Sequence, residues 1–176
     1  MDDFGLCRRA GPTSEAVNRT LSGLKEVPVC SHCGCDAIPV IEALMADHAV
    51  MAANVRRIER ALDAQKPVSA NSLTAELARS FAHHRLVEHA GLFSQLLEAG
   101  ELQERIDRLE LEDAQLSAAL VEADARTQPE RLRRVLAQLV VHNNLENNEV
   151  FPLALQLLPL ERWGAVEAIH QRFLVM

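Results

Sequence analysis

His84-Arg-Leu-Val-Glu88 and His142-Asn-Asn-Leu-Glu146 are two stretches with one pattern, and together they decide the fold. In each, a phenylalanine (Phe93 or Phe151) follows the histidine by nine residues. Residues four apart lie on the same face of an α-helix, so each stretch can direct a nitrogen and an oxygen ligand at one point. Two such helices facing each other would build a metal site inside a helical bundle.

Outside these stretches, the spacing of apolar residues predicts further helices. We expect long helices over about residues 36–64, 72–98 and 101–125, a fourth from about 127 past Pro152, and a short final helix over 160–174. The chain offers end signals: Asp36 as an N-cap, a loop at 65–71, Gly100 as a stop, and Thr127 to Glu130 as a capping box. Pro152 is expected to kink or end the fourth helix.

These elements predict an all-α protein, an up-down-up-down four-helix bundle, because four long helices with short loops pack in that way. We expect a weakly structured N-terminal extension over residues 1–29 and a cysteine-rich loop over 30–36. The bundle and its final helix then occupy residues 37–176.

Composition limits the classes of function. The chain has 176 residues, 48% of them hydrophobic, and a formal net charge of -7. An acidic surface repels phosphate backbones, so we expect no nucleic-acid partner. No apolar run approaches the roughly 18 residues of a membrane span, and the first residues lack a signal-peptide core, so no membrane association and a cytoplasmic location are expected.

Ionisable residues interrupt the apolar stripe of every long helix near its middle. They are His48, His84, Glu88, Asp113, His142 and Glu146. Burying such groups without a partner costs several kcal/mol each, and a pair of divalent cations would remove that cost. Imidazole with carboxylate suits iron, manganese or zinc. For a single residue the alternatives stay open: a lone histidine is often a satisfied core residue, and Asp113 could face solvent if the helix phase differs.

The chain resembles the hemerythrin-like, or HHE cation-binding, family. The resemblance covers about residues 33–173 and is carried by Met45-Ala-Asp-His48, by the two histidine–glutamate stretches, and by Gly91-Leu-Phe93 and Val150-Phe-Pro152. It implies a four-helix bundle holding two iron ions in a non-haem site. It also implies that His48, His84 and His142 are terminal ligands and that Glu88 and Glu146 bridge the irons.

Three positions depart from the family pattern. Asp113 stands where the family usually supplies a histidine, and His89 and Asn147 stand where many members carry a second acidic residue. The extra carboxylate should stabilise higher metal charge, which disfavours reversible O2 carriage and leaves room for mixed metal loading.

The remaining polar residues receive lesser roles. His89 could contact a ligand residue or replace one as a ligand, and Glu149 could contact a ligand residue. His83 should face away from the site, and His170 should be a surface or packing residue. The N-terminal loop holds a further cluster: Cys30, His32, Cys33 and Cys35 could bind zinc, form a reversible thiol pair, or remain free thiols.

Two kinds of function follow. The first is a di-iron protein that binds, senses or reacts with O2, peroxide or nitric oxide, either as a peroxidase- or catalase-like enzyme or as a sensor without turnover. The second is a metal-stabilised helical module that acts through a protein partner or as a homodimer, without small-molecule chemistry. A third alternative is a metal-free bundle whose site has decayed.

Overall fold

The structure is a computed structural model that describes residues 38–174, and its elements in this range are helices. In chain order they are α1 (Pro39–Asp63), α2 (Pro67–Glu88), η4 (His89–Phe93), α3 (Ser94–Glu98), α4 (Gln103–Glu122), α5 (Pro129–Leu145), η5 (Glu146–Val150), α6 (Phe151–Leu157) and α7 (Leu160–Leu174). The two η elements are single π-helical turns.

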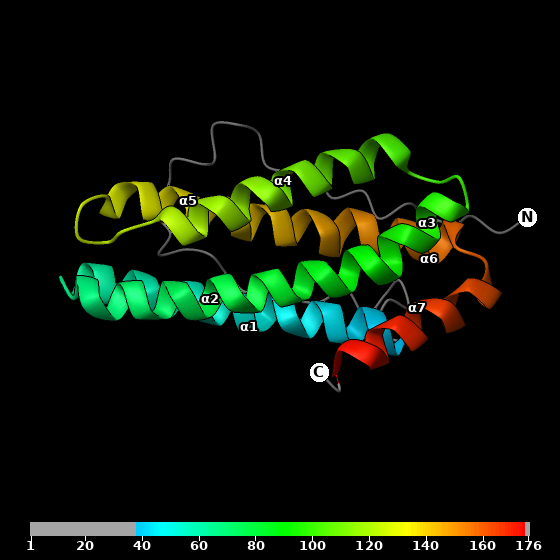
Figure 1. The fold of residues 1–176 in the computed structure, drawn as a ribbon, viewed down its shortest axis with the longest axis horizontal. Helices are drawn as coiled ribbons and strands as arrows, with labels where there is room; N and C mark the ends of the chain where they lie inside the picture. The colour runs from blue at the N-terminus through cyan, green and yellow to red at the C-terminus, as the bar shows by residue number, and fades with distance from the viewer. Residues whose placement is uncertain (1–37, 175–176) are drawn as a thin grey trace, which may run out of the picture.

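The long helices form a closed four-helix bundle (Figure 1). Helix α1 packs against α2 and α5, and α4 packs against the same two neighbours. Helix α2, η4 and α3 follow one another without a break, as do α5, η5 and α6. Helix α7 lies across the end of the bundle near α3 and α6 and packs against α1, α2 and η4. The predicted bundle with a short C-terminal helix is confirmed.

Prolines begin three of the four long helices, and the first two of these starts bear on the predictions. Helix α1 starts at Pro39 with Ile38 as its N-cap, and Asp36, which we expected there, lies outside the described residues. Helix α2 starts at Pro67, so the predicted loop over 65–71 is wrong. A proline at the first helical position suits a helix because its fixed φ is already helical and its missing N–H would have had no partner there.

Two helix ends are closed by a left-handed residue. Gly100 has φ 78°, and Glu101 N–H and Gly100 N–H donate back to the carbonyls of Leu96 and Leu97. The predicted stop at Gly100 is therefore confirmed. Gln65 has φ 54° and closes α1 in the same way, without the freedom that glycine would have.

The start of α5 differs from the prediction. Helix α5 begins at Pro129, and its N-cap residue, Gln128, makes no side-chain capping bond. The Thr127 hydroxyl donates to Asp124 Oδ2 instead of capping the helix, so the expected capping box is wrong. Pro152 does not end the fourth rod, which is formed by α5, η5 and α6, because the chain stays helical through the π turn η5 and Pro152 falls in the first turn of α6.

Buried hydrophobic residues gather in two clusters. The first lies toward α7 and includes Val40, Leu44, Met45, Val87, Phe93, Ile106, Leu109, Phe151 and Val166. The second fills the opposite half and includes Met51, Ile58, Leu77, Phe81, Leu116, Leu132 and Leu139. On every long helix the boundary between the clusters falls at the polar residues singled out from the sequence, which therefore form a layer across the middle of the core.

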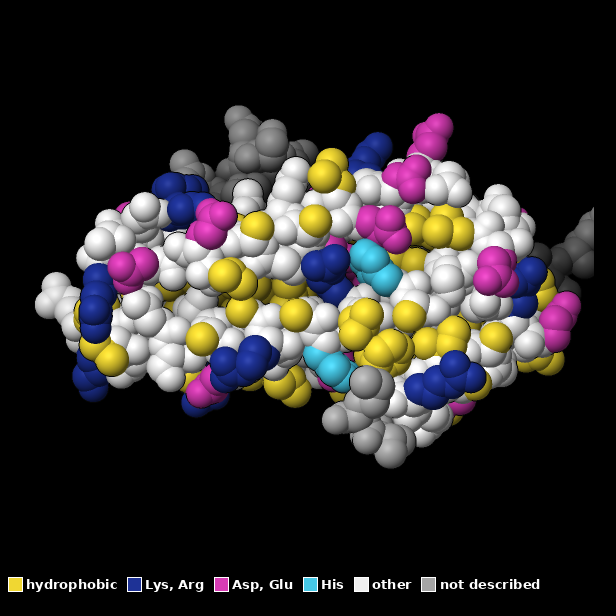
Figure 2. Space-filling view, in the orientation of Figure 1, with side chains coloured by type: hydrophobic (Ala, Val, Ile, Leu, Met, Phe, Trp, Pro, Cys, Tyr) yellow, Lys and Arg dark blue, Asp and Glu magenta, His cyan; other side chains and the backbone are white. Residues whose placement is uncertain are grey.

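Acidic and basic side chains are interspersed on the face shown in Figure 2, with hydrophobic side chains between them. Within residues 38–174, no helix has the length and apolar character needed to cross a membrane.

Candidate metal centre

All six predicted ligand residues are buried in the polar layer of the bundle. They come from all four long rods: His48 from α1, His84 and Glu88 from α2, Asp113 from α4, His142 from α5 and Glu146 from the first position of η5. The structure thus confirms that these residues point inward. Asp113, for which a solvent-facing orientation stayed open, is 1% exposed.

Three residues form a nitrogen-rich group at one side of the layer. His48 Nε2 lies 2.9 Å from His84 Nε2 and 3.2 Å from Glu146 Oε2. These residues can each offer one ligand atom to a shared cation. Two imidazoles facing each other through Nε2 atoms place two lone pairs at one point, which is the arrangement a metal ion requires.

Three residues form an oxygen-rich group at the other side. His142 Nε2 lies 2.9 Å from Asp113 Oδ1 and 3.1 Å from Glu146 Oε1. These three residues can also hold a cation together. Glu146 belongs to both groups and directs one oxygen at each.

The spacing of the donor atoms fits cations at the two groups. Two ligand atoms at about 2.1 Å from one ion and at right angles would lie about 3.0 Å apart, and the four short contacts above fall near this value. Both carboxylate oxygens of Glu146 and Asp113 Oδ1 are buried, and among the described residues none of the three has a hydrogen-bond partner. A buried carboxylate oxygen that accepts no hydrogen bond destabilises the folded protein, and a bound cation would compensate for the missing hydrogen bond.

Glu88 enters the layer without joining either group. Its Oε2 lies 3.9 Å from His84 Nε2, and its Oε1 is buried with no hydrogen-bond partner in the described part of the chain. Burial raises the pKa of Glu88 well above its usual range, and the nearby carboxylates of Glu146 and Asp113 raise it further. A nearby cation would oppose this shift, because it favours the charged carboxylate.

The π turns determine which side chains follow the glutamates into the core. On a regular α-helix, nine residues would place Phe93 about 180° from His84, facing away from it. Yet Phe93 and Phe151 are both fully buried. Each π turn inserts one extra residue into the helix, so the rotation between the histidine and the phenylalanine is about 100° smaller than on a regular α-helix. Both phenylalanines therefore face the core. The Phe151 ring then stacks on His48 with ring centroids 5.7 Å apart.

The outer nitrogens of the histidines face oxygen atoms. His48 Nδ1 lies 2.8 Å from Asn147 Oδ1, and His84 Nδ1 lies 3.3 Å from Asp47 Oδ2. His142 Nδ1 is 3.5 Å from Glu112 Oε2 without a hydrogen bond. An acceptor at Nδ1 places the ring proton there and leaves Nε2 free to bind a cation. Sequence reasoning missed Asp47 and Glu112, although each directly precedes a predicted ligand.

His89 reaches the layer through Asp113. Its Nε2 lies 2.5 Å from Asp113 Oδ2, and its Nδ1 lies 3.5 Å from Glu110 Oε1. Asp113 therefore turns one oxygen to His89 and the other to His142. Of the two expectations for His89, the structure shows the contact with a ligand residue, and His89 does not belong to either group of three.

The pKa values of the histidines and carboxylates in the layer depend on their contacts with one another. Burial lowers the pKa of His142, but the carboxylates of Asp113 and Glu146 outweigh this effect and raise it to about 11. Burial raises the pKa of Glu146, but its contacts with His142 and His48 lower it well below the usual range. His84 differs from His142, because burial lowers the pKa of His84 and favours the neutral imidazole.

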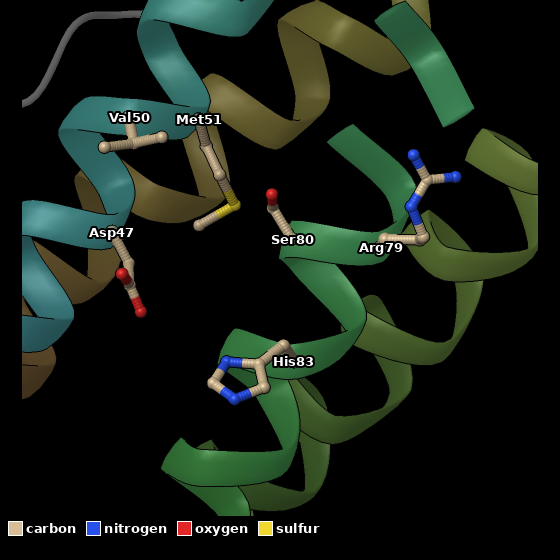
Figure 3. Close-up of a pocket in the computed structure, with 6 residues that line it drawn as sticks. All are labelled: Asp47, Val50, Met51, Arg79, Ser80 and His83. Atoms are coloured by element: carbon tan, nitrogen blue, oxygen red, sulfur yellow. The ribbon is translucent and has the colours of Figure 1, made fainter. Parts of the chain in front are cut away.

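A surface hollow of about 340 Å³ opens between α1 and α2 beside the layer (Figure 3). Its lining residues are Asp47, Val50, Met51, Arg79, Ser80 and His83. Because Asp47 also contacts His84, the hollow lies one side chain away from the nitrogen-rich group.

Other predicted residues lie elsewhere. Glu149 sits at the surface, where Arg105 Nη1 lies 2.9 Å from its Oε2, so the structure does not bring it to the layer. His83 is exposed, as expected, and His170 is buried in α7. The predicted cysteine cluster, Cys30, His32, Cys33 and Cys35, lies outside the described residues, as does the N-terminal extension.

Comparison with known proteins agrees with this geometry. The family model of the hemerythrin HHE cation binding domain matches residues 40–154, more than half of the chain. The chain therefore belongs to the hemerythrin HHE cation-binding family. Comparisons with curated proteins and with solved structures gave no match.

Proposed function

We propose that this chain is a non-haem di-iron protein that binds or reacts with O2, peroxide or nitric oxide. One observation carries the proposal: two buried groups of three donor residues share Glu146, which points one oxygen at each group. A single carboxylate serving two groups suits a pair of ions better than one ion. Iron is the metal that the family resemblance implies, and mixed imidazole and carboxylate donors suit it.

Each residue of the layer has a role in this proposal. His48, His84 and His142 would supply nitrogen donors and Asp113 and Glu146 would supply carboxylate oxygens, with the carboxylate of Glu88 beside His84. Two bound ions would offset the negative charges that protons offset in the ion-free layer. Bound iron would supply Lewis acidity, one-electron chemistry and coordination positions that a small molecule can occupy.

The surroundings of the layer support reactivity toward small molecules. Phe81, Phe93 and Phe151 are fully buried, and their rings lie against His142, His89 and His48. These rings exclude water from the layer, which strengthens electrostatic interactions inside it. The hollow beside Asp47 brings solvent close to His84, so a small molecule has only a short distance to travel to the layer.

Metal analysis of protein expressed without added metal tests the proposal most directly. We expect about two irons per chain, with anomalous scattering at the iron edge placing both between His48 and Asp113. The iron-loaded protein should then change its absorption spectrum on exposure to nitric oxide or peroxide. Turnover of peroxide would identify an enzyme, and a spectral and conformational change without turnover would identify a sensor.

Glu149→Gln is the matched control, because it removes a carboxylate of the same π turn that lies at the surface. This variant should load and respond like the natural chain. Protein that holds a redox-silent metal and ignores all three small molecules would contradict the proposal and favour a structural module that acts through a protein partner.

A further inference from the structure

We infer that the two ion positions differ in metal selectivity, so that in the absence of iron a mixture of other divalent ions fills them in a fixed order. The position between His48 and His84 selects a late first-row divalent ion, represented by Zn²⁺. The position between Asp113 and His142 has a smaller preference for such an ion and accepts a harder ion, represented by Mn²⁺, when that ion is in excess. This inference rests on the proposed function, because it requires two ions in each chain.

The donor atoms that the positions do not share are different. Glu146 contributes one oxygen to each group, so it does not distinguish them. The remaining donors of the first group are two imidazoles, whose Nε2 atoms lie 2.9 Å apart. The remaining donors of the second group are one imidazole and the carboxylate of Asp113. The second position therefore has one nitrogen fewer and one negative charge more.

This difference changes the relative affinity of the two ions. Any site of nitrogen and oxygen donors binds Zn²⁺ more tightly than Mn²⁺. Imidazole donors increase this difference in affinity, and carboxylate donors decrease it. The first Zn²⁺ should therefore enter the nitrogen-rich position. An excess of Mn²⁺ can then compete for the oxygen-rich position, where Zn²⁺ has the smaller advantage.

The structure holds the Asp113 carboxylate in place at the second position. Asp113 Oδ2 lies 2.5 Å from His89 Nε2, and Asp113 Oδ1 is directed toward His142. A donor fixed from behind by a hydrogen bond keeps its orientation when an ion binds.

Besides the shared Glu146, the carboxylate closest to His84 Nε2 is that of Glu88 at 3.9 Å, and Glu88 does not belong to the group of three. Within the described part of the chain, the carboxylate nearest to the outer side of His84 is Asp47, and it faces Nδ1 rather than the ion-binding Nε2. The side chains of both groups are almost fully buried, so solvent screens the difference between them only weakly.

The test begins with the full chain freed of metal by chelation. One equivalent of Zn²⁺ is added together with an excess of Mn²⁺, and native mass spectrometry then counts the species. We expect one dominant species with one zinc and one manganese. Crystals of this sample, measured at the zinc and manganese absorption edges, should place zinc at His48 and His84 and manganese at Asp113 and His142.

Variants test the origin of the order. Asp113→Asn keeps the size of the side chain and removes its charge, so Mn²⁺ should bind on the order of 100-fold more weakly while one Zn²⁺ is retained. Glu149→Gln should leave both ions in place. Circular dichroism checks that each variant is folded, and the edge measurement on the natural chain decides the order even if Asp113→Asn does not fold.

The possible results separate the two proposals. A chain that binds two ions in a random mixture of zinc–zinc, zinc–manganese and manganese–manganese species, or with the elements exchanged between positions, overturns this inference and leaves the two-ion site intact. A chain that binds fewer than two ions of any kind overturns the proposed function itself.

Discussion

The rod formed by α2 and η4 and the rod formed by α5 and η5 repeat one local design with different electrostatic results. Each carries a histidine and a glutamate four residues apart, a π turn at or directly after the glutamate, and a buried phenylalanine nine residues after the histidine. Yet Glu146 lies within 3.2 Å of two histidines, whereas Glu88 is 3.9 Å from one. Burial and two neighbouring carboxylates raise the pKa of Glu88, and contacts with His142 and His48 hold that of Glu146 low.

The comparison extends to the residue that follows each glutamate. His89 contacts Asp113 on α4, and Asn147 contacts His48 on α1. The residue after the glutamate therefore contacts a different neighbouring helix in each rod, α4 in one and α1 in the other. Spacing along the chain aims a side chain at the layer, but the residues opposite it decide its charge and its role.

Replacement of the two glutamates should separate the rods most strongly. Glu146→Gln removes a charge shared by both groups, so we expect the loss of both ions, with affinity reduced on the order of 100-fold or more. Glu88→Gln in the other rod should keep at least one ion, because Glu88 belongs to neither group of three. Metal content by mass spectrometry measures both variants, and equal losses would contradict the distinction between them.

The two phenylalanines should matter similarly for stability and differently for metal. Phe93→Ala and Phe151→Ala each leave a cavity in a fully buried site, so each should lower the free energy of unfolding by about 3 to 5 kcal/mol. Only Phe151→Ala should also weaken metal binding at the nitrogen-rich group, because Phe151 stacks on His48. Urea unfolding and zinc titration of both variants test this, and unchanged zinc affinity in Phe151→Ala would refute the second part.

Proton release should set the pH dependence of metal binding. The pKa of His142 is raised from 6.5 to about 11 in the ion-free protein, so His142 contributes stability that is complete below 6.5 and is lost as the pH rises through 11. A cation must displace that proton, so apparent affinity should rise by up to about tenfold per pH unit between 6.5 and 11.

Thermal unfolding with and without zinc from pH 6.5 to 9 measures this effect. The difference in midpoint between loaded and ion-free protein should widen as the pH rises. A difference that stays constant or narrows would show that His142 is not protonated in the ion-free layer.

The smallest effect on metal affinity should come from residues that contact the outer nitrogens of the histidine ligands. Asn147→Ala removes the contact to His48 Nδ1, so the nitrogen-rich position should weaken by about tenfold, the lower end of what such contacts contribute. Asn147→Asp keeps an acceptor at the same place and should bind zinc as tightly as the natural chain. Isothermal titration measures both, and equal weakening in the two variants would point to altered packing rather than loss of the acceptor.

The fold and the inward-facing residues were accessible from the sequence because they follow the 3.6-residue period of long helices. His48, Asp113 and the two histidine–glutamate pairs interrupt otherwise regular apolar stripes, and burial of such groups has few solutions. Helix ends were harder, because Pro67 can sit in a loop or start a helix, and only the packing of the first turn decides between them.

The π turns were not predicted, although the sequence contained their signal. A buried phenylalanine nine residues after a buried histidine does not fit a regular helix, and it occurs twice. Glu149, a candidate for contact with a ligand, lies within the second π turn and pairs with Arg105 at the surface instead. Asp47 and Glu112 were missed because a contact to an outer histidine nitrogen depends on the approach of a neighbouring helix.

The placement of charged groups between two separate hydrophobic clusters has a consequence for how the bundle opens. Each half of the core is held by its own contacts, and across the boundary between them the ion-free chain has only proton-balanced polar side chains. Without cations, we expect the half near α7 to exchange its amide hydrogens independently of the other half, as local unfolding units do. Cations bound by all four rods would join the halves into one cooperative unit, so that metal supply governs how long the whole protein survives proteolysis.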